Sequence, residues 1–444
     1  MDLPVYLCTQ RRSMIKVLLI TYYWPPAGGG GVQRWLKMSK YLPDQGVDLT
    51  VYTPENGEFP GYDPSLVEEV DPRINILKHP IWEPYSIFKK FTGKKSNSYN
   101  ALITEGEKSS WKQDLAVFLR GNFFIPDARC FWIGPSIKYL SQLLETHTYD
   151  VIISTGPPHS MHMIALGLKN RFPNIKWVAD FRDPWTMIDF YKDLKLTSWA
   201  DRRHHAMENK VLSTADEIVT ISPSCADDLM GLANRPIQVI HNGFDEEDFK
   251  NAAPALDSDF TIVHIGSMNK DRNPRVLWEV LGQLIQKNPS FAQFIKIELV
   301  GIVDGSIVES IQKAGLKNQL SVIGQQNHKA VIQRMRSAQI LLLPINDIPQ
   351  QKGVMPGKMY EYLGAARPIL AFGLPDSDTA KLLHDTGAGN LFGYNDKKGL
   401  EEYLDKAIKT YQSGRLEVSS QGYLRYSRKN LASKYSELLH KLVS

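Results

Sequence analysis

Short apolar runs recur along the chain, and each is followed by a polar turn and then by a stretch with helical periodicity. In the first half the runs include IKVLLITYYW and KWVADF, and in the second half they include FTIVHIGS and RPILAFG. Such runs, alternating with helices, are typical of parallel strands that are covered on both faces. The pattern therefore predicts an α/β fold made of doubly wound parallel sheets.

The chain of 444 residues is longer than one hydrophobic core usually organises, so two domains are expected. The polar stretch NAAPALDSD, residues 251–259, falls just before a fresh apolar run and predicts the boundary between them. The predicted parts are an N-terminal extension without structure (1–13), an N-terminal Rossmann-like domain (14–252), a C-terminal Rossmann-like domain (253–420) and a final helix (421–444) that packs back on the N-terminal domain.

Composition and charge exclude several classes of function. A net charge of +4 is too small to indicate nucleic-acid binding, and the three cysteines are too far apart for a metal motif or a disulfide framework. The tripeptide DSD occurs at 257–259 and at 376–378, in the predicted boundary and at a predicted helix start, so no metal site is expected. No apolar run approaches the roughly 20 residues of a membrane-spanning helix. A cytoplasmic or peripheral protein is expected.

The stretch YYWPPAGGGGVQRW places Gly28–Gly31 between the first predicted strand and the first predicted helix. Glycine loses more backbone entropy on ordering than any other residue, so a run of four carries a folding cost. At the carboxyl end of a parallel strand such a turn lets backbone N–H groups approach an anion or a sugar. Gly29, Gly30 and Gly31 are therefore predicted to bind a ligand, and a flexible loop is the alternative.

In GVMPGKMYEYLGAARPIL, Pro356 and Gly357 lead into a helix whose first turn carries Lys358 and Glu361. A lysine at a helix N-terminus opposes the helix dipole, and this cost makes sense if a phosphate sits there. Lys358 is then predicted to bind the phosphate, Gly357 to lie beside it and Glu361 to accept hydrogen bonds from ribose hydroxyls. The alternative is a solvated Lys358 and a Glu361 that merely complements the dipole.

A basic loop follows the first strand of the second half. In HIGSMNKDRNPRVLW the residues Gly266, Ser267, Lys270 and Arg272 gather at the carboxyl end of that strand, with Arg275 just beyond. Arginine binds phosphate oxygens in bidentate fashion, so this loop predicts a pyrophosphate site. A solvated surface loop is the alternative.

Two further strand ends in the first half carry polar residues. VADFRDPW places Arg182 and Asp183, and TGPPHSMH places His159 and His162, at the same edge of the predicted sheet as the glycines. Both pairs are expected to face the same cleft as the glycines, and for a histidine a purely structural role is the alternative.

The segment 81–95, IWEPYSIFKKFTGKK, interleaves aromatic residues with lysines. This mixture fits a peripheral contact with an anionic membrane, and an ordinary surface loop is the alternative.

Taken together, these motifs resemble retaining nucleotide-sugar glycosyltransferases of family 4, which have the GT-B fold of two Rossmann-like domains facing a cleft. The resemblance runs from about Met14 to the C-terminus and is strongest over 237–372, where HNGFDEEDF and PGKMYEYLGAARPIL are similar to family segments. DFRDPW is similar to the variant in members that build surface polysaccharides.

The resemblance implies specific roles. Glu361 matches the second glutamate of the family's E-x7-E motif, which contacts ribose, and Arg272 falls at the family's phosphate-binding lysine. The first glutamate of that motif falls on Gly353, and the family's arginine after the strand-end glycine falls on Ser267. Arg272 and Lys358 are the predicted catalytic cations for the departing diphosphate, with His159 and Asp183 on the acceptor side.

The resemblance implies a metal-independent, retaining transfer of a sugar from a nucleoside diphosphate, expected to be UDP, to a glycan or lipid-linked acceptor. No cofactor is expected, because the nucleotide sugar is itself a substrate. Two alternatives stay open. One is a sugar-nucleotide-binding protein without transfer activity, for which Gly353 is the argument, and the other is a non-hydrolysing UDP-sugar 2-epimerase.

Overall fold

The structure is a computed structural model that describes residues 14–83, 111–347, 352–414, 416 and 421–444. It divides into two compact units. The first contains the described residues up to Ile221 together with Ala226–Ile240 and Ala432–Ser444, and the second contains Ser222–Cys225 and His241–Leu431. The predicted extension 1–13 and residues 84–95 of the predicted membrane-contact segment lie outside the described residues. Each unit is built around one parallel sheet, which confirms the predicted α/β class.

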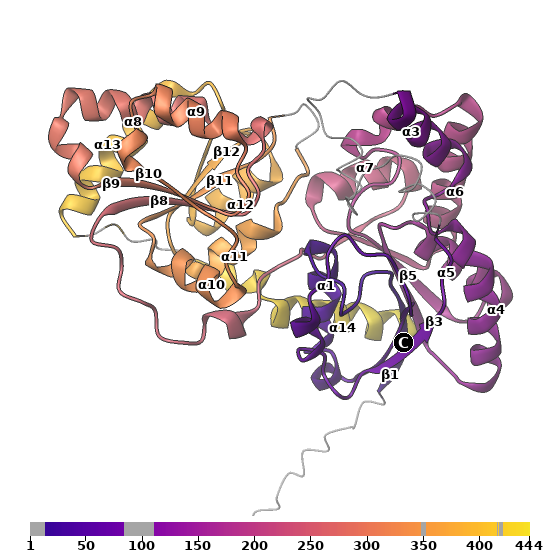
Figure 1. The fold of residues 1–444 in the computed structure, drawn as a ribbon. Helices are drawn as coiled ribbons and strands as arrows, with labels where there is room; N and C mark the ends of the chain where they lie inside the picture. The colour runs from indigo at the N-terminus through magenta and orange to yellow at the C-terminus, as the bar shows by residue number, and fades with distance from the viewer. Residues whose placement is uncertain (1–13, 84–110, 348–351, 415, 417–420) are drawn as a thin grey trace, which may run out of the picture. The chain divides into compact units, whose positions relative to one another are not determined.

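The first unit has a seven-stranded sheet in the order β3-β2-β1-β4-β5-β6-β7 (Figure 1). All pairings between these strands are parallel. Its strands are β1 (Ile15–Ile20), β2 (Val47–Pro54), β3 (Asn75–His79), β4 (Val151–Gly156), β5 (Lys176–Phe181), β6 (Glu217–Thr220) and β7 (Gln238–Val239). The order reverses between β1 and β4, and open α/β sheets bind ligands at the carboxyl ends of the strands at such a point.

Helices connect these strands, as parallel pairing requires. They are α1 (Gly30–Ser39), α3 (Trp111–Phe123), α4 (Cys130–Thr146), α5 (Ser160–Arg171), α6 (Ser198–Thr214) and α7 (Pro223–Ala233), with short 3₁₀ turns η1 (Pro43–Gln45), η2 (Pro64–Val67) and η4 (Asp189–Leu194). The core contains large aromatic side chains. Tyr52 of β2, for example, stacks on Trp132 of α4 with ring centroids 4.9 Å apart.

The second unit has a six-stranded sheet in the order β10-β9-β8-β11-β12-β13, again with parallel pairings and with a reversal between β8 and β11. Its strands are β8 (Phe260–Ile265), β9 (Ile295–Val300), β10 (Leu320–Ile323), β11 (Ile340–Pro344), β12 (Ile369–Phe372) and β13 (Gly389–Phe392). The helices are α8 (Arg275–Lys287), α9 (Gly305–Lys313), α10 (His328–Ser337), α11 (Gly357–Ala365), α12 (Asp378–Thr386), α13 (Lys397–Gln412) and α14 (Arg428–Val443). The 3₁₀ turns are η5 (Glu246–Phe249), η6 (Lys270–Arg272), η7 (Pro289–Gln293), η8 (Lys317–Gln319) and η9 (Tyr423–Tyr426).

Both faces of this second sheet are buried. Phe260 and Ile262 of β8 belong to a cluster with α8, α9 and α13, whereas Val263 and Ile265 belong to a cluster with α10, α11 and α12 (Figure 1). Successive side chains of a strand point to opposite faces, so a strand covered on both sides must be apolar throughout. This explains why FTIVHI is mostly apolar, with Thr261 and His264 as its polar residues.

The last helix, α14, contributes its residues from Ala432 onward to the first unit. There Tyr435 lies edge-on to Trp35 of α1 with ring centroids 5.1 Å apart, and the Ser436 hydroxyl donates to the carbonyl of Gln45 at 2.9 Å. The Lys434 ammonium donates to the carbonyl of Val239 at 2.8 Å. The end of α14 thus contacts α1, η1 and β7 of the first unit.

Candidate functional site

The loops after β1 and β4 lie at the reversal point of the first sheet, and the glycine run belongs to the first of them. Gly29 caps α1 with φ +88°, a left-handed conformation that favours glycine. A Cβ on Gly31 would lie 3.0 Å from the Tyr23 ring, and one on Gly28 would lie 3.3 Å from Asp63. Gly30 is exposed, and a Cβ there would meet no atom within 4 Å. A side chain would thus be strained at Gly29 and tightly packed at Gly28 and Gly31, whereas at Gly30 it would meet open space.

Arg182, which follows β5, joins the two loops at this point. Its Nη1 donates to the carbonyl of Gly31 at 2.6 Å and its Nε to the carbonyl of Gly156 at 3.3 Å, while Nη2 donates to the carbonyl of Pro157. The guanidinium is buried, and burial lowers its pKa below the usual range for arginine. Arg182 thus fixes the spacing between the α1 turn and the loop after β4.

A second buried charge, Asp180 of β5, lies beneath the same loops. Its carboxylate accepts hydrogen bonds from Arg34 Nη2 at 2.8 Å, Trp35 Nε1 at 2.8 Å and Thr155 Oγ1 at 2.9 Å. Burial alone would raise the pKa of Asp180, but the charge and hydrogen bonds of Arg34 hold it below the ordinary value. The ionised pair connects α1, β4 and β5, so the helix that starts at the glycines is anchored to the sheet.

His159 belongs to the loop after β4, as the residue that precedes α5, and it is buried. Its ring stacks on Trp185 with centroids 4.5 Å apart and planes 3° from parallel, and burial lowers its pKa well below the ordinary value. The neighbouring His162 bonds through Nδ1 to Ser154 Oγ at 2.8 Å, and burial lowers its pKa to about 3. A Cβ on Gly156 would lie 2.6 Å from His162 Nε2 and 3.2 Å from His159 Nδ1, so both rings pack on that glycine. These histidines are neutral side chains of a packed core.

Asp183 is exposed, and its charge acts on the neighbouring Arg182. The structure therefore brings Gly31, Gly156 and Arg182 together, with Asp183 on the solvent side of the group.

In the second unit the corresponding reversal point lies between β8 and β11. Gly266 follows β8 with φ +128°, and a Cβ on Gly301, which follows β9, would lie 2.4 Å from the carbonyl oxygen of Gly266. Arg272 spans the reversal point: its Nη1 donates to the carbonyl of Ser267 at 3.1 Å and its Nε to Asn346 Oδ1, just after β11, at 2.6 Å. Among the described residues, Arg272 Nη2 has no hydrogen-bond partner. Burial lowers the pKa of this guanidinium.

Lys358 and Glu361 lie on the first turns of α11, which begins at Gly357, and they contact one another. Lys358 Nζ is 2.6 Å from Glu361 Oε2, and each side chain is about one-third exposed (33% and 29%). No side chain caps the helix, and its first turn contains no acidic residue. The N-terminus of α11 therefore combines a helix start without a side-chain cap with a lysine.

Arg272 and Lys358 both act electrostatically on His264, which lies near the end of β8. Its Nδ1 bonds to the carbonyl of Leu342 at 3.0 Å, and its Nε2 is buried without a hydrogen-bond partner among the described residues. Burial lowers the pKa of His264 to about 4, and the charges of Arg272 and Lys358 both contribute. Two positive groups from different elements thus act on one point at the end of β8.

Lys270 and Gly353 have other neighbours. Lys270 is exposed on η6, and its charge, after hydrogen bonds from Ser306, helps to lower the pKa of Asp304 at the start of α9. Gly353 lies against Cys225: a Cβ there would be 3.0 Å from its sulfur and 3.3 Å from Ser222 Oγ. A glutamate side chain at position 353 would press against Cys225 and Ser222.

The two DSD sequences have other partners. Asp257 pairs with Arg334 at 2.7 Å, and Asp378 accepts hydrogen bonds from the backbone N and hydroxyl of Ser224 at 2.8 and 3.0 Å. The cap of α12 is Ser377, whereas an aspartate of the tripeptide was expected there. Among the described residues, no group of three or more His, Cys, Asp or Glu side chains could hold a metal ion.

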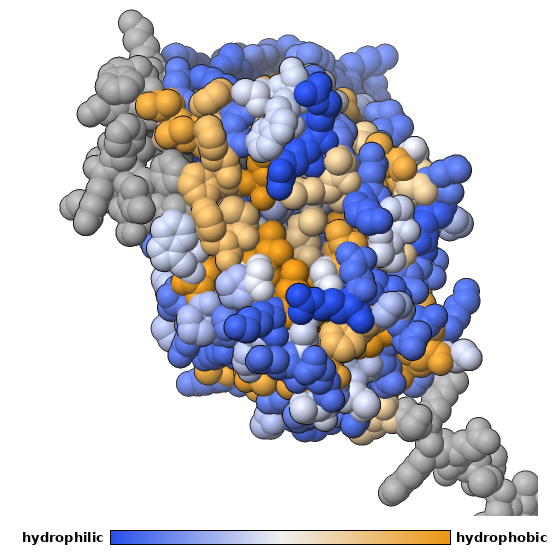
Figure 2. Space-filling model, turned by 90° about the vertical axis from the view of Figure 1, so that its right-hand side faces the viewer, coloured by the Kyte–Doolittle hydropathy of each residue, from blue (hydrophilic) through white to orange (hydrophobic). Residues whose placement is uncertain are grey.

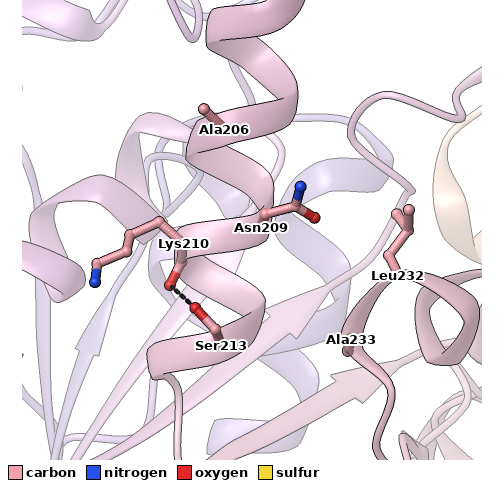
Figure 3. Close-up of a pocket in the computed structure, with 6 residues that line it drawn as sticks. All are labelled: Ala206, Asn209, Lys210, Ser213, Leu232 and Ala233. Carbon is pink, nitrogen blue, oxygen red and sulfur yellow. Dashed lines mark hydrogen bonds between the residues drawn. The ribbon is translucent and has the colours of Figure 1, made fainter.

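A shallow hollow of about 450 Å³ lies between α6 and the end of α7 in the first unit (Figure 3). It is lined by Ala206, Asn209, Lys210, Ser213, Leu232 and Ala233, which include none of the predicted site residues. Figure 3 shows Ser213 turned back to donate to the carbonyl of Lys210. The hollow offers few directed polar groups, so it adds nothing to the candidate site.

Sequence reasoning did not assign roles to Arg182, Asp180 and His264. A signal was present for two of them, because Asp180 in KWVADF and His264 in FTIVHI are polar residues inside buried parallel strands. Such residues are rarely buried without partners.

Two family models match the chain. Residues 99–248 match Glycosyltransferase Family 4, and residues 245–423 match Glycosyl transferases group 1. The second range contains Arg272, Lys358, Glu361 and the whole six-stranded sheet. This protein is a glycosyltransferase.

Several solved structures share the fold of this chain. A glycosyltransferase from Rickettsia africae aligns over 98% of this chain and 100% of its own, with 13% identity and a TM-score of 0.62. HepE from Anabaena, in complex with UDP-glucose, aligns over 96% and 100%, with 14% identity and a TM-score of 0.59. A TarM variant from S. aureus, in complex with fondaparinux, α-GlcNAc-glycerol and UDP, aligns over 96% and 100%, with 12% identity and a TM-score of 0.59. These likenesses identify the GT-B fold of this glycosyltransferase.

No curated protein sequence matches the chain significantly. Within the described residues, no helix of this glycosyltransferase is both long and apolar enough to cross a membrane.

Proposed function

We propose that this glycosyltransferase transfers a sugar from a UDP-linked donor to a glycan or lipid-linked acceptor, with retention of configuration and without a metal ion. The observation that carries the proposal is the pair of cations at the end of β8. Arg272 and Lys358 come from different elements and both act on His264, beside an uncapped helix N-terminus. A diphosphate is the ligand chemistry that this arrangement favours.

The chemistry requires charge stabilisation above all. When the bond between the sugar C1 and the diphosphate oxygen breaks, negative charge develops on the leaving group. Donors that are already in place can stabilise that charge with little reorganisation. Arg272 is held by Asn346 and Ser267 and keeps Nη2 for a ligand, so its position is fixed before the donor arrives.

Lys358 and Glu361 have complementary roles in this proposal. The Lys358 ammonium, which pairs with Glu361 in this structure, binds the diphosphate instead. Glu361 is then available to accept hydrogen bonds from the ribose hydroxyls. On the same face of the sugar, the acceptor oxygen bonds to C1 and its proton passes to the leaving phosphate. The HepE structure with UDP-glucose and the TarM structure with UDP support the choice of a UDP-linked donor. The glycan ligands of the TarM structure support the choice of acceptor class.

Calorimetry with UDP, GDP, ADP and their common sugars tests the donor site. We expect one nucleotide to bind, and Arg272→Ala and Glu361→Ala each to weaken it at least tenfold, about 1.4 kcal/mol. Glu309→Ala and Lys313→Ala are matched controls, because they form an exposed pair on α9 of the same unit. Equal effects of the control and site substitutions would refute the assignment.

Turnover then separates transfer from binding alone. We expect release of UDP to depend on an acceptor and to persist in EDTA, and the product anomer, read by NMR, to match the donor. Binding of UDP-sugar without release, with acceptors of several classes, would favour a binding protein that lacks transfer activity. Gly353, at the position of the family's first glutamate, is the feature behind that alternative.

A further inference from the structure

His264 is a polar side chain at a position where the fold does not satisfy all of its hydrogen-bonding groups. Hydrophilic side chains cover much of the face of the first unit that Figure 2 shows, where they are in contact with water. His264 lies inside β8 of the second unit and is only 4% exposed. Its Nε2 has no hydrogen-bond partner among the described residues. Buried polar atoms are nearly always paired, so an unpaired one needs a physical reason.

The backbone around the His264 ring favours its protonated form. Nδ1 lies 3.0 Å from the carbonyl oxygen of Leu342, which accepts a hydrogen bond only if Nδ1 carries the hydrogen. A neutral ring has one N–H, so Nε2 then carries a lone pair. Nε2 lies next to the turn at Gly266, where an added Cβ would be 4.0 Å from it, and the backbone of Ser267 raises the pKa of the ring. Only the imidazolium, with an N–H at both nitrogens, can donate on both sides.

Burial and two cations nevertheless keep the ring neutral in this structure. Burial, and then the charges of Arg272 and Lys358, lower the pKa of His264 to about 4. Glu361 pairs with Lys358 at 2.6 Å and offsets part of its charge. Tyr362 of α11 accepts a hydrogen bond from the backbone of β8 at 3.0 Å, and burial raises its pKa, so its hydroxyl stays neutral. The charges that oppose protonation of His264 thus come from Arg272 and Lys358.

A diphosphate at the proposed donor site would reverse this balance. It brings negative charge to Arg272 and Lys358, the two groups that oppose protonation of His264. A nearby opposite charge shifts a pKa by about 1–3 units toward the charged form. The pKa of His264 should therefore rise from about 4 to between about 5 and 7 when a diphosphate binds.

We propose that His264 is a positioning residue that binds one proton from solvent when a diphosphate occupies the donor site. The imidazolium then donates from both ring nitrogens to the backbone, and it adds a third positive charge to those of Arg272 and Lys358. Arg272 Nη1 also donates to the carbonyl of Ser267, so the protonated ring steadies the turn that positions this guanidinium. The inference rests on the proposed function, because the diphosphate is what makes protonation favourable.

Calorimetry of UDP binding in buffers with different enthalpies of ionisation counts the protons that the complex takes up. The variant His264→Asn keeps a hydrogen-bond donor for the carbonyl of Leu342 but cannot be protonated, and the protons of UDP itself cancel in the difference between the two chains. At pH 5 we expect the native chain to take up about 0.4–0.9 proton more per bound UDP than His264→Asn, as a rise in pKa from about 4 to about 5–7 requires. If GDP or ADP is the nucleotide that binds, it replaces UDP.

The matched control is His384→Asn. The His384 side chain lies on α12 of the same unit and is 90% exposed, so its loss should leave the proton count unchanged.

The pH dependence of the affinity is a readout that a purely structural role would not change. The ratio of the UDP dissociation constants of His264→Asn and the native chain should grow about 2- to 80-fold as the pH falls from 8 to 5. If His264 only filled space, the ratio would be the same at every pH.

A measurement on the native chain covers the case in which His264→Asn does not fold or does not bind UDP. The histidine NMR signals are then titrated without and with UDP, and one histidine should move from a pKa of about 4 to a value at least one unit higher. Equal proton uptake by the two chains with UDP bound to both, or histidine signals whose pKa values UDP does not change, would overturn the role of His264 and leave the donor site standing. Failure of the native chain to bind UDP, GDP or ADP would overturn both.

Discussion

Replacing Gly30 by alanine tests whether the bare backbone at this position is needed for the stability of the fold or for binding a ligand. Gly30 is the first residue of α1, and its added Cβ would enter open space. Alanine reduces the freedom of the unfolded chain at a position that the folded chain tolerates, so the free energy of unfolding should rise by about 0.4–1 kcal/mol. If the bare backbone serves a ligand, the same methyl group should lower kcat/KM at least tenfold, about 1.4 kcal/mol.

The two neighbouring glycines provide the controls. Gly29→Ala forces a side chain into φ +88° and should cost about 1–2 kcal/mol of stability. Gly31→Ala brings a methyl group to 3.0 Å from the Tyr23 ring and should also destabilise. Urea unfolding and steady-state transfer assays are run on all three variants. A Gly30→Ala protein that is more stable and fully active would refute the idea that a ligand needs this backbone.

Three other perturbations test the buried groups. The free energy of unfolding should fall as the pH drops from about 6.5 toward 3, because His162 binds a proton in the unfolded chain but not in the folded one, where it is buried. The expected slope is about 1.4 kcal/mol per pH unit for each histidine buried in this way. Urea titrations at pH 7 and pH 5 measure this slope, and an unchanged slope in His162→Gln would count against it. Asp180→Asn leaves Arg34 buried without its counter-charge and should cost about 3–5 kcal/mol in the same assay; a loss below 1 kcal/mol would contradict the buried pair. Gly353→Glu should cost about 1–3 kcal/mol because its side chain meets Cys225, and a variant with native stability and higher turnover would instead show that the family's glutamate can be restored.

The central strands could be predicted from the sequence because burial on both faces leaves a continuous apolar run. β3 (NILKH) and β13 (GNLF) were not predicted, and both are edge strands of their sheets. The side chains of these two strands are exposed or half-buried, so no continuous apolar run marks them.

The site was predictable only in part. Parallel strands place their carboxyl ends at one edge, which is why the glycine run and the basic loop were found at strand ends. The sequence could not decide which residue of the neighbouring pair Arg182 and Asp183 turns inward, since the alternation of a strand ends there. The structure turns Arg182 in and leaves Asp183 exposed. His159 stays a predicted acceptor-side residue, and its stacking on Trp185 is a three-dimensional contact that spacing cannot show.

The acceptors of Arg182 are all main-chain carbonyls, those of Gly31, Gly156 and Pro157. Hydrogen bonds of this kind depend on the path of the backbone and not on the side chains of the residues that accept them. Gly31 and Gly156 are themselves packed too closely to carry a side chain, but other residues of the loops after β1 and β4 can change while the distance between the loops stays fixed. The surface of these loops can thus vary without rebuilding the frame that supports them.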